Sequence, residues 1–136
     1  TFTAPHAAVL AVDDNRVNIT VVKGLLKRLK VRFDSALSGQ ECLDKVRQKH
    51  YDIILLDHMM PEMDGIETLR RMRQMQEYRM NPPVVIALTA NAIVGAKEEY
   101  LREGFRDYLS KPIDFMKMEE MIRLYLPEEM IEYTES

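Results

Sequence analysis

Short apolar runs alternate along the chain with longer segments in which apolar residues recur at helical spacing. Ala7–Val12, Asp52–Leu56 and Val84–Leu88 are almost uninterrupted apolar runs, which are typical of strands buried on both faces of a parallel sheet. Val31–Ala36 is more polar and predicts an edge strand, whereas Asp107–Ser110 predicts a last short strand. The apolar runs therefore predict five strands.

The segments between these runs have the periodicity of amphipathic helices, with apolar residues at spacings of three and four. Ser38 and Glu41 have the spacing of a capping box, and Gly104 is a typical residue after a helix end. Strict alternation of strands and helices implies right-handed crossovers and a parallel sheet with helices on both faces. We therefore expect a three-layer, doubly wound α/β domain. Its five predicted helices begin near Asn15, Ser38, Asp64, Ile93 and Asp114.

The composition narrows the range of functions. A chain of 136 residues, 46% hydrophobic and 30% charged, fits one soluble domain. We expect this domain over residues 7–126, between a linker (1–6) and a poorly ordered acidic tail (127–136). The net charge of −3 argues against direct binding of nucleic acid, and no apolar run approaches the roughly 20 residues of a membrane helix. A single cysteine fits a reducing, cytoplasmic compartment.

Charged and hydroxyl side chains stand where the predicted strands end. Asp13 and Asp14 directly follow the first strand, and Asp57 directly follows the third. Thr89 follows the fourth strand, and Lys111 follows the fifth. Because ligands of open α/β sheets bind outside the carboxyl ends of the strands, we expect these side chains to share one site.

The residue types at this edge point to phosphoryl chemistry. Three carboxylates in one crevice repel one another unless a cation lies between them, and without histidine or cysteine ligands Mg²⁺ is favoured. Lys111 would pair with a phosphoryl oxygen, and the Thr89 hydroxyl would donate a hydrogen bond to another. A carboxylate beside Mg²⁺ can attack phosphorus and form an aspartyl-phosphate. Each residue alone is explained by turns, helix caps or solvated surface, but capping does not explain all of them at consecutive strand ends.

Over residues 7–126 the sequence resembles the response regulator receiver domain of two-component phosphorelays. The resemblance implies a flavodoxin-like (βα)5 fold with strand order 2-1-3-4-5, counted along the chain. Asn18, together with the lead-in Phe2-Thr3-Ala4-Pro5, looks most like receivers attached to hybrid sensor histidine kinases. The four motifs that carry the resemblance are Val12-Asp13-Asp14-Asn15, Asp57-His58-Met59-Met60-Pro61-Glu62-Met63-Asp64-Gly65, Ala87-Leu88-Thr89-Ala90 and Asp107-Tyr108-Leu109-Ser110-Lys111-Pro112.

The resemblance also implies a role for each acidic residue. Asp57 is the expected phosphoacceptor. Asp14 and Asp57 are expected to bind Mg²⁺ directly, with Mn²⁺ as an alternative ion. Asp13 is expected to act through water, and the backbone carbonyl of Met59 is expected to be a further ligand.

Other residues are expected to hold the phosphoryl group or to respond to it. Thr89 and Lys111 would contact the phosphoryl oxygens, and the Lys111–Pro112 peptide bond would be cis. Thr89 and Tyr108 fall at the two switch positions of the family. Asn91 and Met59 fall at variable positions that modulate the lifetime of the phosphoryl group.

The expected function is a phosphorylation switch rather than an enzyme, with at most self-phosphorylation and autodephosphorylation. The donor would be a phosphohistidine of a histidine kinase or of a histidine phosphotransfer domain. Phosphorylation would change the surface formed by the Ile93–Glu103 helix, the last strand and the Asp114–Leu126 helix, through which a weak homodimer could also form. We expect a cytoplasmic domain with no direct membrane contact, whose parent chain could be a membrane-anchored histidine kinase.

Two alternatives stay open at this point. A small Mg²⁺-dependent phosphatase would also use an aspartyl nucleophile after a strand, but that chemistry usually needs a second carboxylate where this chain has Met59, and it usually needs a cap domain. A receiver-like interaction module that is never phosphorylated would not need all five polar residues of the strand ends.

Overall fold

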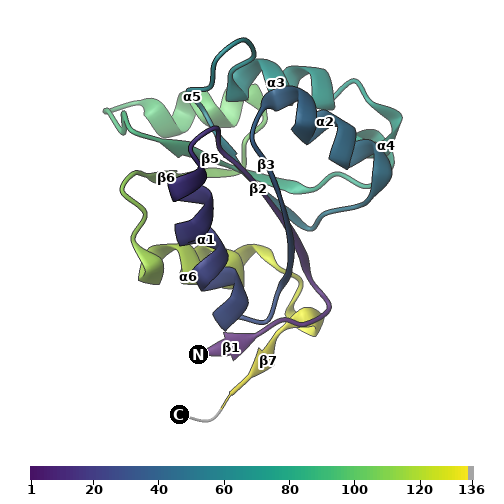
Figure 1. Cartoon of the computed structure of the whole chain (residues 1–136), viewed down its shortest axis with the longest axis vertical. Coiled ribbons are helices and arrows are strands. Elements are labelled where there is room, and N and C mark those ends of the chain that lie inside the picture. The colour runs from purple at the N-terminus through teal and green to yellow at the C-terminus, as the bar shows by residue number, and fades with distance from the viewer. Residues whose placement is uncertain (135–136) are drawn as a thin grey trace.

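A five-stranded parallel sheet forms the middle of the computed structural model, which describes residues 1–134 (Figure 1). The order across the sheet is β3-β2-β4-β5-β6. Counted along the chain among these five strands, this is the predicted order 2-1-3-4-5, so the predicted flavodoxin-like topology is confirmed. The strands are β2 (Ala8–Val12), β3 (Arg32–Ala36), β4 (Ile53–Asp57), β5 (Val84–Thr89) and β6 (Asp107–Ser110).

Helices cover both faces of the sheet and make it the middle of three layers (Figure 1). The helices α1 (Arg16–Arg28) and α6 (Phe115–Tyr125) pack on one face. The helices α2 (Gly39–Gln48), α3 (Gly65–Met72) and α5 (Ala96–Glu103) pack on the other face. Each face therefore has its own apolar cluster, and the central strands contribute to both.

The central strands explain why their sequences are almost continuously apolar. In β4, Ile53 and Leu55 pack toward α1 and α6, whereas Ile54 and Leu56 pack toward the opposite helices. Every residue of this strand is buried. Because successive side chains of a strand point to opposite faces, a strand between two helix layers has no polar face.

The structure corrects two of the predicted helices. The helix expected to begin near Ile93 begins at Ala96, because Gly95 has a φ of +88° that a right-handed helix does not contain, and Ile93 is 71% exposed in the preceding loop. The helix expected from Asp64 onward ends at Met72, and a separate short helix, α4 (Gln76–Met80), follows. The break covers residues 73–75 and ends at Met75, whose backbone is extended with a ψ of 142°. The described residues therefore contain six α-helices in place of the predicted five.

The predicted linker and poorly ordered tail are wrong for the part of the chain that the structure describes. The strands β1 (Phe2–Thr3) and β7 (Glu132–Tyr133) pair antiparallel, and the 3₁₀ helix η1 (Glu128–Met130) precedes β7. We call residues 1–4 with 128–134 the terminal clasp. Phe2, Ala4 and Ile131 of the clasp are buried against the cluster beneath α1 and α6, which gives both segments an ordered position. The last two residues of the expected tail, 135 and 136, lie outside the described residues.

Among residues 1–134, none of the helices combines the length and the hydropathy that a bilayer crossing requires.

Candidate functional site

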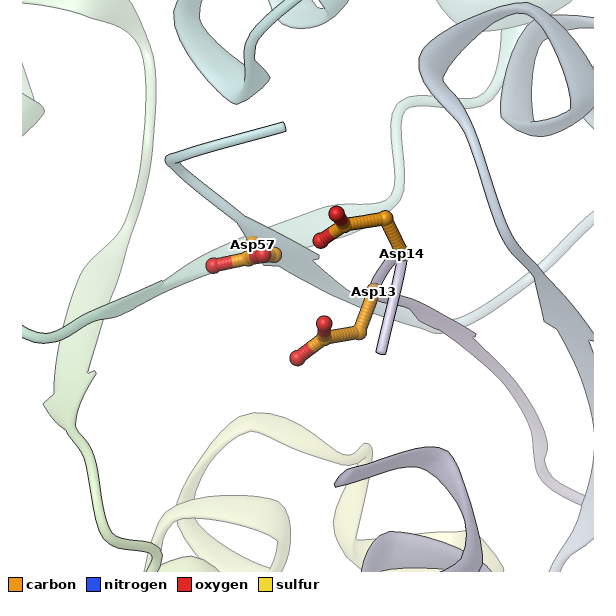
Figure 2. Close-up of side chains that lie close together, drawn as sticks. All are labelled: Asp13, Asp14 and Asp57. Atoms are coloured by element: carbon orange, nitrogen blue, oxygen red, sulfur yellow. The ribbon is translucent and has the colours of Figure 1, made fainter. Parts of the chain in front are cut away.

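The polar residues expected to share one site lie together at the carboxyl edge of the sheet. Asp13 and Asp14 follow β2, and Asp57 is the last residue of β4. Thr89 is the last residue of β5, and Lys111 follows β6. Figure 2 shows the three aspartates around one space, and oxygens of all three carboxylates lie within 4.8 Å of one another. The parallel topology thus brings together residues up to 98 positions apart in the sequence.

Lys111 bridges two of the three carboxylates. Its Nζ donates hydrogen bonds to Asp13 Oδ2 and to Asp57 Oδ1, each over 2.9 Å. Burial by itself lowers the pKa of Lys111, but the bonds with both aspartates outweigh burial and hold this pKa above its ordinary value. The lysine is therefore charged at neutral pH. The Lys111–Pro112 peptide bond is cis, the isomer that the resemblance implies.

Asp57 is the most centrally placed acid and is only 3% exposed. Burial raises the pKa of its carboxyl, Lys111 lowers it, and the charges of Asp13 and Asp14 raise it again, with the result that it lies above its ordinary value of 3.8. One ammonium group faces three carboxylates, so negative charge is in excess. Donors that are all oxygen, with this excess charge, fit a hard divalent cation such as Mg²⁺.

The loop from β4 to α3 folds back closely against the end of β4. The Gly65 N–H donates to the His58 carbonyl over 2.8 Å, and a Cβ at Gly65 would lie 2.4 Å from the Asp57 carbonyl oxygen. Only glycine fits this approach. The same loop contains Met59, which comes two residues after Asp57 in the sequence and is 63% exposed.

A small cavity of about 130 Å³ lies beside the buried Thr89 and is also lined by Met59, Asn91 and Tyr100. Thr89 Oγ1 accepts a hydrogen bond from the Asn91 N–H over 3.0 Å. Tyr108 is half-buried and stacks on Tyr100, with ring centroids 6.0 Å apart and 29° between the rings. The residues predicted from the sequence to respond to phosphorylation therefore meet around Tyr100.

Sequence reasoning missed the contacts of Tyr100 and of Asn18. The Tyr100 hydroxyl lies 2.6 Å from His58 Nδ1, which links α5 to the residue after Asp57. Asn18 Nδ2 donates to Asp13 Oδ2 over 3.1 Å. Helical periodicity places Tyr100 on a buried face and Asn18 in the first turn of a helix, but it names no partner. The partners are 42 and five positions away and belong to other segments.

The fold and this edge define a class of protein: a doubly wound α/β domain that gathers a buried aspartate, two further acids and a lysine at the carboxyl edge of its sheet. The family model of the response regulator receiver domain matches residues 9–123. The chain therefore belongs to the response regulator receiver domain family, whose members are phosphoacceptor signalling domains of two-component phosphorelays.

A receiver within a longer sensor kinase is similar to this chain. Over 119 residues, 37% are identical to the signal transduction histidine-protein kinase BarA of Shigella flexneri. The match covers 88% of this chain but spans only 13% of the length of that relative. The similarity thus concerns the receiver and leaves the other parts of that kinase without a counterpart here.

Two solved structures are similar to the whole domain. The receiver of sensor histidine kinase PA1611 from Pseudomonas aeruginosa PAO1, with magnesium coordinated in its active-site cleft, is 33% identical with a TM-score of 0.78, covering 88% of this chain and 96% of that one. The receiver of Ssk1 from Saccharomyces cerevisiae, in complex with the histidine phosphotransfer protein Ypd1, is 26% identical with a TM-score of 0.81, covering 92% and 90%. Receiver domains thus include one with magnesium in its active-site cleft and one that forms a complex with a phosphotransfer protein.

Proposed function

We propose that this domain is a phosphorylation-dependent switch in which Asp57 accepts a phosphoryl group from a phosphohistidine. The observation that carries the proposal is the arrangement at the carboxyl edge. Asp57 is buried at the end of β4, receives Lys111 over 2.9 Å, and has two more carboxylates within 4.8 Å. This arrangement supports transfer because phosphoryl chemistry depends mostly on positioning and on neutralising charge.

Mg²⁺, or Mn²⁺ in its place, would be held directly by Asp14 and Asp57, through water by Asp13, and by the backbone carbonyl of Met59. When bound, the cation neutralises the charge that a phosphoryl group brings into an already acidic site. The exposure of Asp14 supports its direct role, since a side chain at the surface can reach a hydrated ion without a change in the core.

In the transfer, a carboxylate oxygen of Asp57 attacks phosphorus, the P–N bond of the phosphohistidine breaks, and the electron pair of that bond stays on the imidazole nitrogen. Lys111 turns from the carboxylates to a phosphoryl oxygen, and the Thr89 hydroxyl donates to another. The donor would belong to a histidine kinase or to a histidine phosphotransfer domain. The relatives BarA and the Ssk1–Ypd1 pair support both kinds of donor.

The signal would leave the site through Thr89. As Thr89 moves toward the phosphoryl group, the space beside it opens and Tyr108 rotates inward. The surface of α5, β6 and α6 then changes, and partners recognise it or a weak homodimer forms through it. Support comes from the cavity beside Thr89 and from the half-buried position of Tyr108. Met59 and Asn91, which line that cavity, would modulate the lifetime of the phosphoryl group.

We place this receiver in the cytoplasm, as part of a hybrid sensor histidine kinase whose other segments could anchor it to a membrane. The similarity to BarA supports this parent. We expect no direct contact of the receiver itself with nucleic acid or lipid, because its net charge is −3.

A phosphatase that turns over phosphoesters is the second candidate. It would need an acid/base group close to Asp57, but the side chain two residues later is the exposed thioether of Met59. The third candidate is an interaction module that is never phosphorylated. Such a module would lose stability by burying Asp57 among like charges and would gain no function from it.

Intact-mass measurement after incubation with MgCl₂ and acetyl phosphate tests the proposal. The wild-type chain should gain the mass of one phosphoryl group in an acid-stable, base-labile form, and Asp57→Asn should gain none. Asp44→Asn, which makes the same change on an exposed side chain of α2, serves as the matched control and should react like the wild type. Catalytic release of phosphate from a phosphoester would favour the phosphatase, and a wild-type chain that gains no adduct would favour the interaction module.

A further inference from the structure

The three acids of the site differ in how many hydrogen bonds they accept. Within residues 1–134, the Asp13 carboxylate accepts three, from the Asn15 N–H (2.9 Å), Asn18 Nδ2 (3.1 Å) and Lys111 Nζ (2.9 Å). In the same part of the chain, the Asp57 carboxylate accepts one, from Lys111, and the Asp14 carboxylate accepts none. Asp13 is therefore the acid whose position is most strictly determined before any ligand arrives.

The distribution of these bonds over the two oxygens matters for metal binding. A carboxylate offers about four lone-pair positions, two on each oxygen. Asn18 and Lys111 both donate to Oδ2 of Asp13, and the Asn15 N–H donates to Oδ1. One position on Oδ1 is left, which suits a hydrogen bond from a metal-bound water better than direct coordination.

The position of Asn18 explains why its amide reaches the strand end. Asn18 lies in the first turn of α1, five residues after Asp13, and side chains of a helix lean toward its N-terminus. Asn18 is half-buried there, so its hydrogen bond to Asp13 is partly protected from competition with water.

We propose that Asn18 is a positioning residue for the cation: it holds the Asp13 carboxylate as an outer ligand and leaves direct coordination to Asp14 and Asp57. This inference rests on the proposed function, because it assumes that the cation binds at this edge. Partners in the outer shell of a metal site typically change metal affinity by about 10- to 100-fold when they are removed.

The role of Asn18 grows when the phosphoryl group is present. Lys111 then turns toward a phosphoryl oxygen and gives up its bond to Asp13. Asn18 is the remaining side-chain donor on Oδ2, and it keeps the carboxylate from swinging toward the cation or toward the phosphoryl oxygens.

Calorimetric titration of the unphosphorylated chain with MgCl₂ tests this role without reference to activity. Asn18→Leu keeps the volume of the side chain and removes its donor, and Asn18→Ala is the second variant in case leucine does not fit. We expect both to weaken Mg²⁺ binding about tenfold. The control is Ser38→Ala, which removes a helix-cap bond to the Glu41 N–H at the start of α2 and lowers the stability of the chain without touching the acids.

The outcomes separate this inference from the proposed function. If Asn18→Leu and Asn18→Ala resemble Ser38→Ala, with lower stability and wild-type affinity for Mg²⁺, then Asn18 only fastens α1 and the inference is overturned. If the wild-type chain binds no Mg²⁺, the proposed metal role itself fails. Asp14→Asn distinguishes the two cases, because it should lose Mg²⁺ binding only where the wild-type chain has a site at this edge.

Discussion

The carboxyl edge of the sheet and the terminal clasp bury different kinds of side chain. At the carboxyl edge, two of the three clustered acids, Asp13 and Asp57, are almost completely buried around a single lysine. At the clasp, Phe2, Ala4 and Ile131 are buried in an apolar cluster with α1 and α6. Both regions bury side chains, but only the second buries groups that gain free energy by leaving water.

The difference shows where this domain gives up stability for chemistry. Two carboxylates whose oxygens lie within 4.8 Å of each other repel by about 3 kcal/mol at an effective dielectric constant of about 20. Lys111 offsets part of this repulsion, since it contacts two of the acids directly. The clasp, by contrast, closes the apolar cluster at the far end of α1 and holds β1 and β7 together.

The largest expected effect is the loss of Phe2 from the clasp. Phe2→Ala removes a ring that is only 3% exposed and should lower the free energy of unfolding by about 3 kcal/mol, because the vacated space cannot collapse completely. Urea denaturation followed by circular dichroism measures the change. Tyr133→Ala, in the paired strand but 61% exposed, is the matched control and should cost much less. Equal losses for the two variants would show that pairing, and not burial, stabilises the clasp.

At the carboxyl edge the sign should reverse. Asp57→Asn keeps an acceptor for Lys111 and removes one buried charge, so it should raise the free energy of unfolding by about 1 kcal/mol at pH 7 in the presence of EDTA. Thermal or urea denaturation without divalent cations gives the measurement, and Asp44→Asn on the surface should change little. A destabilised Asp57→Asn would contradict the idea that this acid costs stability.

The gain from Asp57→Asn should depend on pH. Folding raises the pKa of Asp57 above its ordinary value of 3.8, so ionisation of this group costs more in the folded chain than in the unfolded chain. Below pH 3.8 the group is largely protonated in both states, and variant and wild type should converge. The gain should grow as the pH rises above 3.8 and then level off once the folded group has ionised. A gain that does not change between pH 4 and pH 7 would assign the effect to shape rather than charge.

The smallest expected effect concerns the polar tip of the clasp. The hydroxyls of Thr1 and Thr134 lie 2.7 Å apart, and both side chains are exposed. Thr134→Val should change the free energy of unfolding by about 0.5 kcal/mol or less, because water replaces the lost bond. Urea denaturation of Thr134→Val and Phe2→Ala under the same conditions compares the two changes in the free energy of unfolding. A loss for Thr134→Val as large as that for Phe2→Ala would show that polar contacts stabilise the clasp.

The sequence predicts the central strands well because burial on both faces requires nearly continuous apolar residues. The same argument fails for the clasp, where Phe2 and Ile131 are single apolar residues in polar surroundings and each depends on a segment at the other end of the chain. The predicted start of α5 was wrong for a local reason, since the apolar spacing of Ile93 fits a helix but the backbone conformation of Gly95 does not. Strand order came from the resemblance, as periodicity contains no order.

The candidate site shows the same division. The positions of Asp57, Thr89 and Lys111 at one edge follow from parallel strands that all end there, and the structure brings them together. The contact of Tyr100 with His58 depends on how far α5 sits from β4, which no local pattern determines. The sequence therefore predicts which side chains lie together at the strand ends. It does not predict which side chains of the helices come into contact with them.

The contact between Thr1 and Thr134 makes this polypeptide suitable for circular permutation. Because Thr1 and Thr134 lie side by side, a short linker could join the segments that carry them, and the chain could be reopened at an exposed loop. The exposed turn at Asn81 and Pro82, between α4 and β5, is a suitable place, because it contributes neither to the acidic edge nor to the clasp. Such a circular permutant would keep every strand pairing while its new ends lie between α4 and β5.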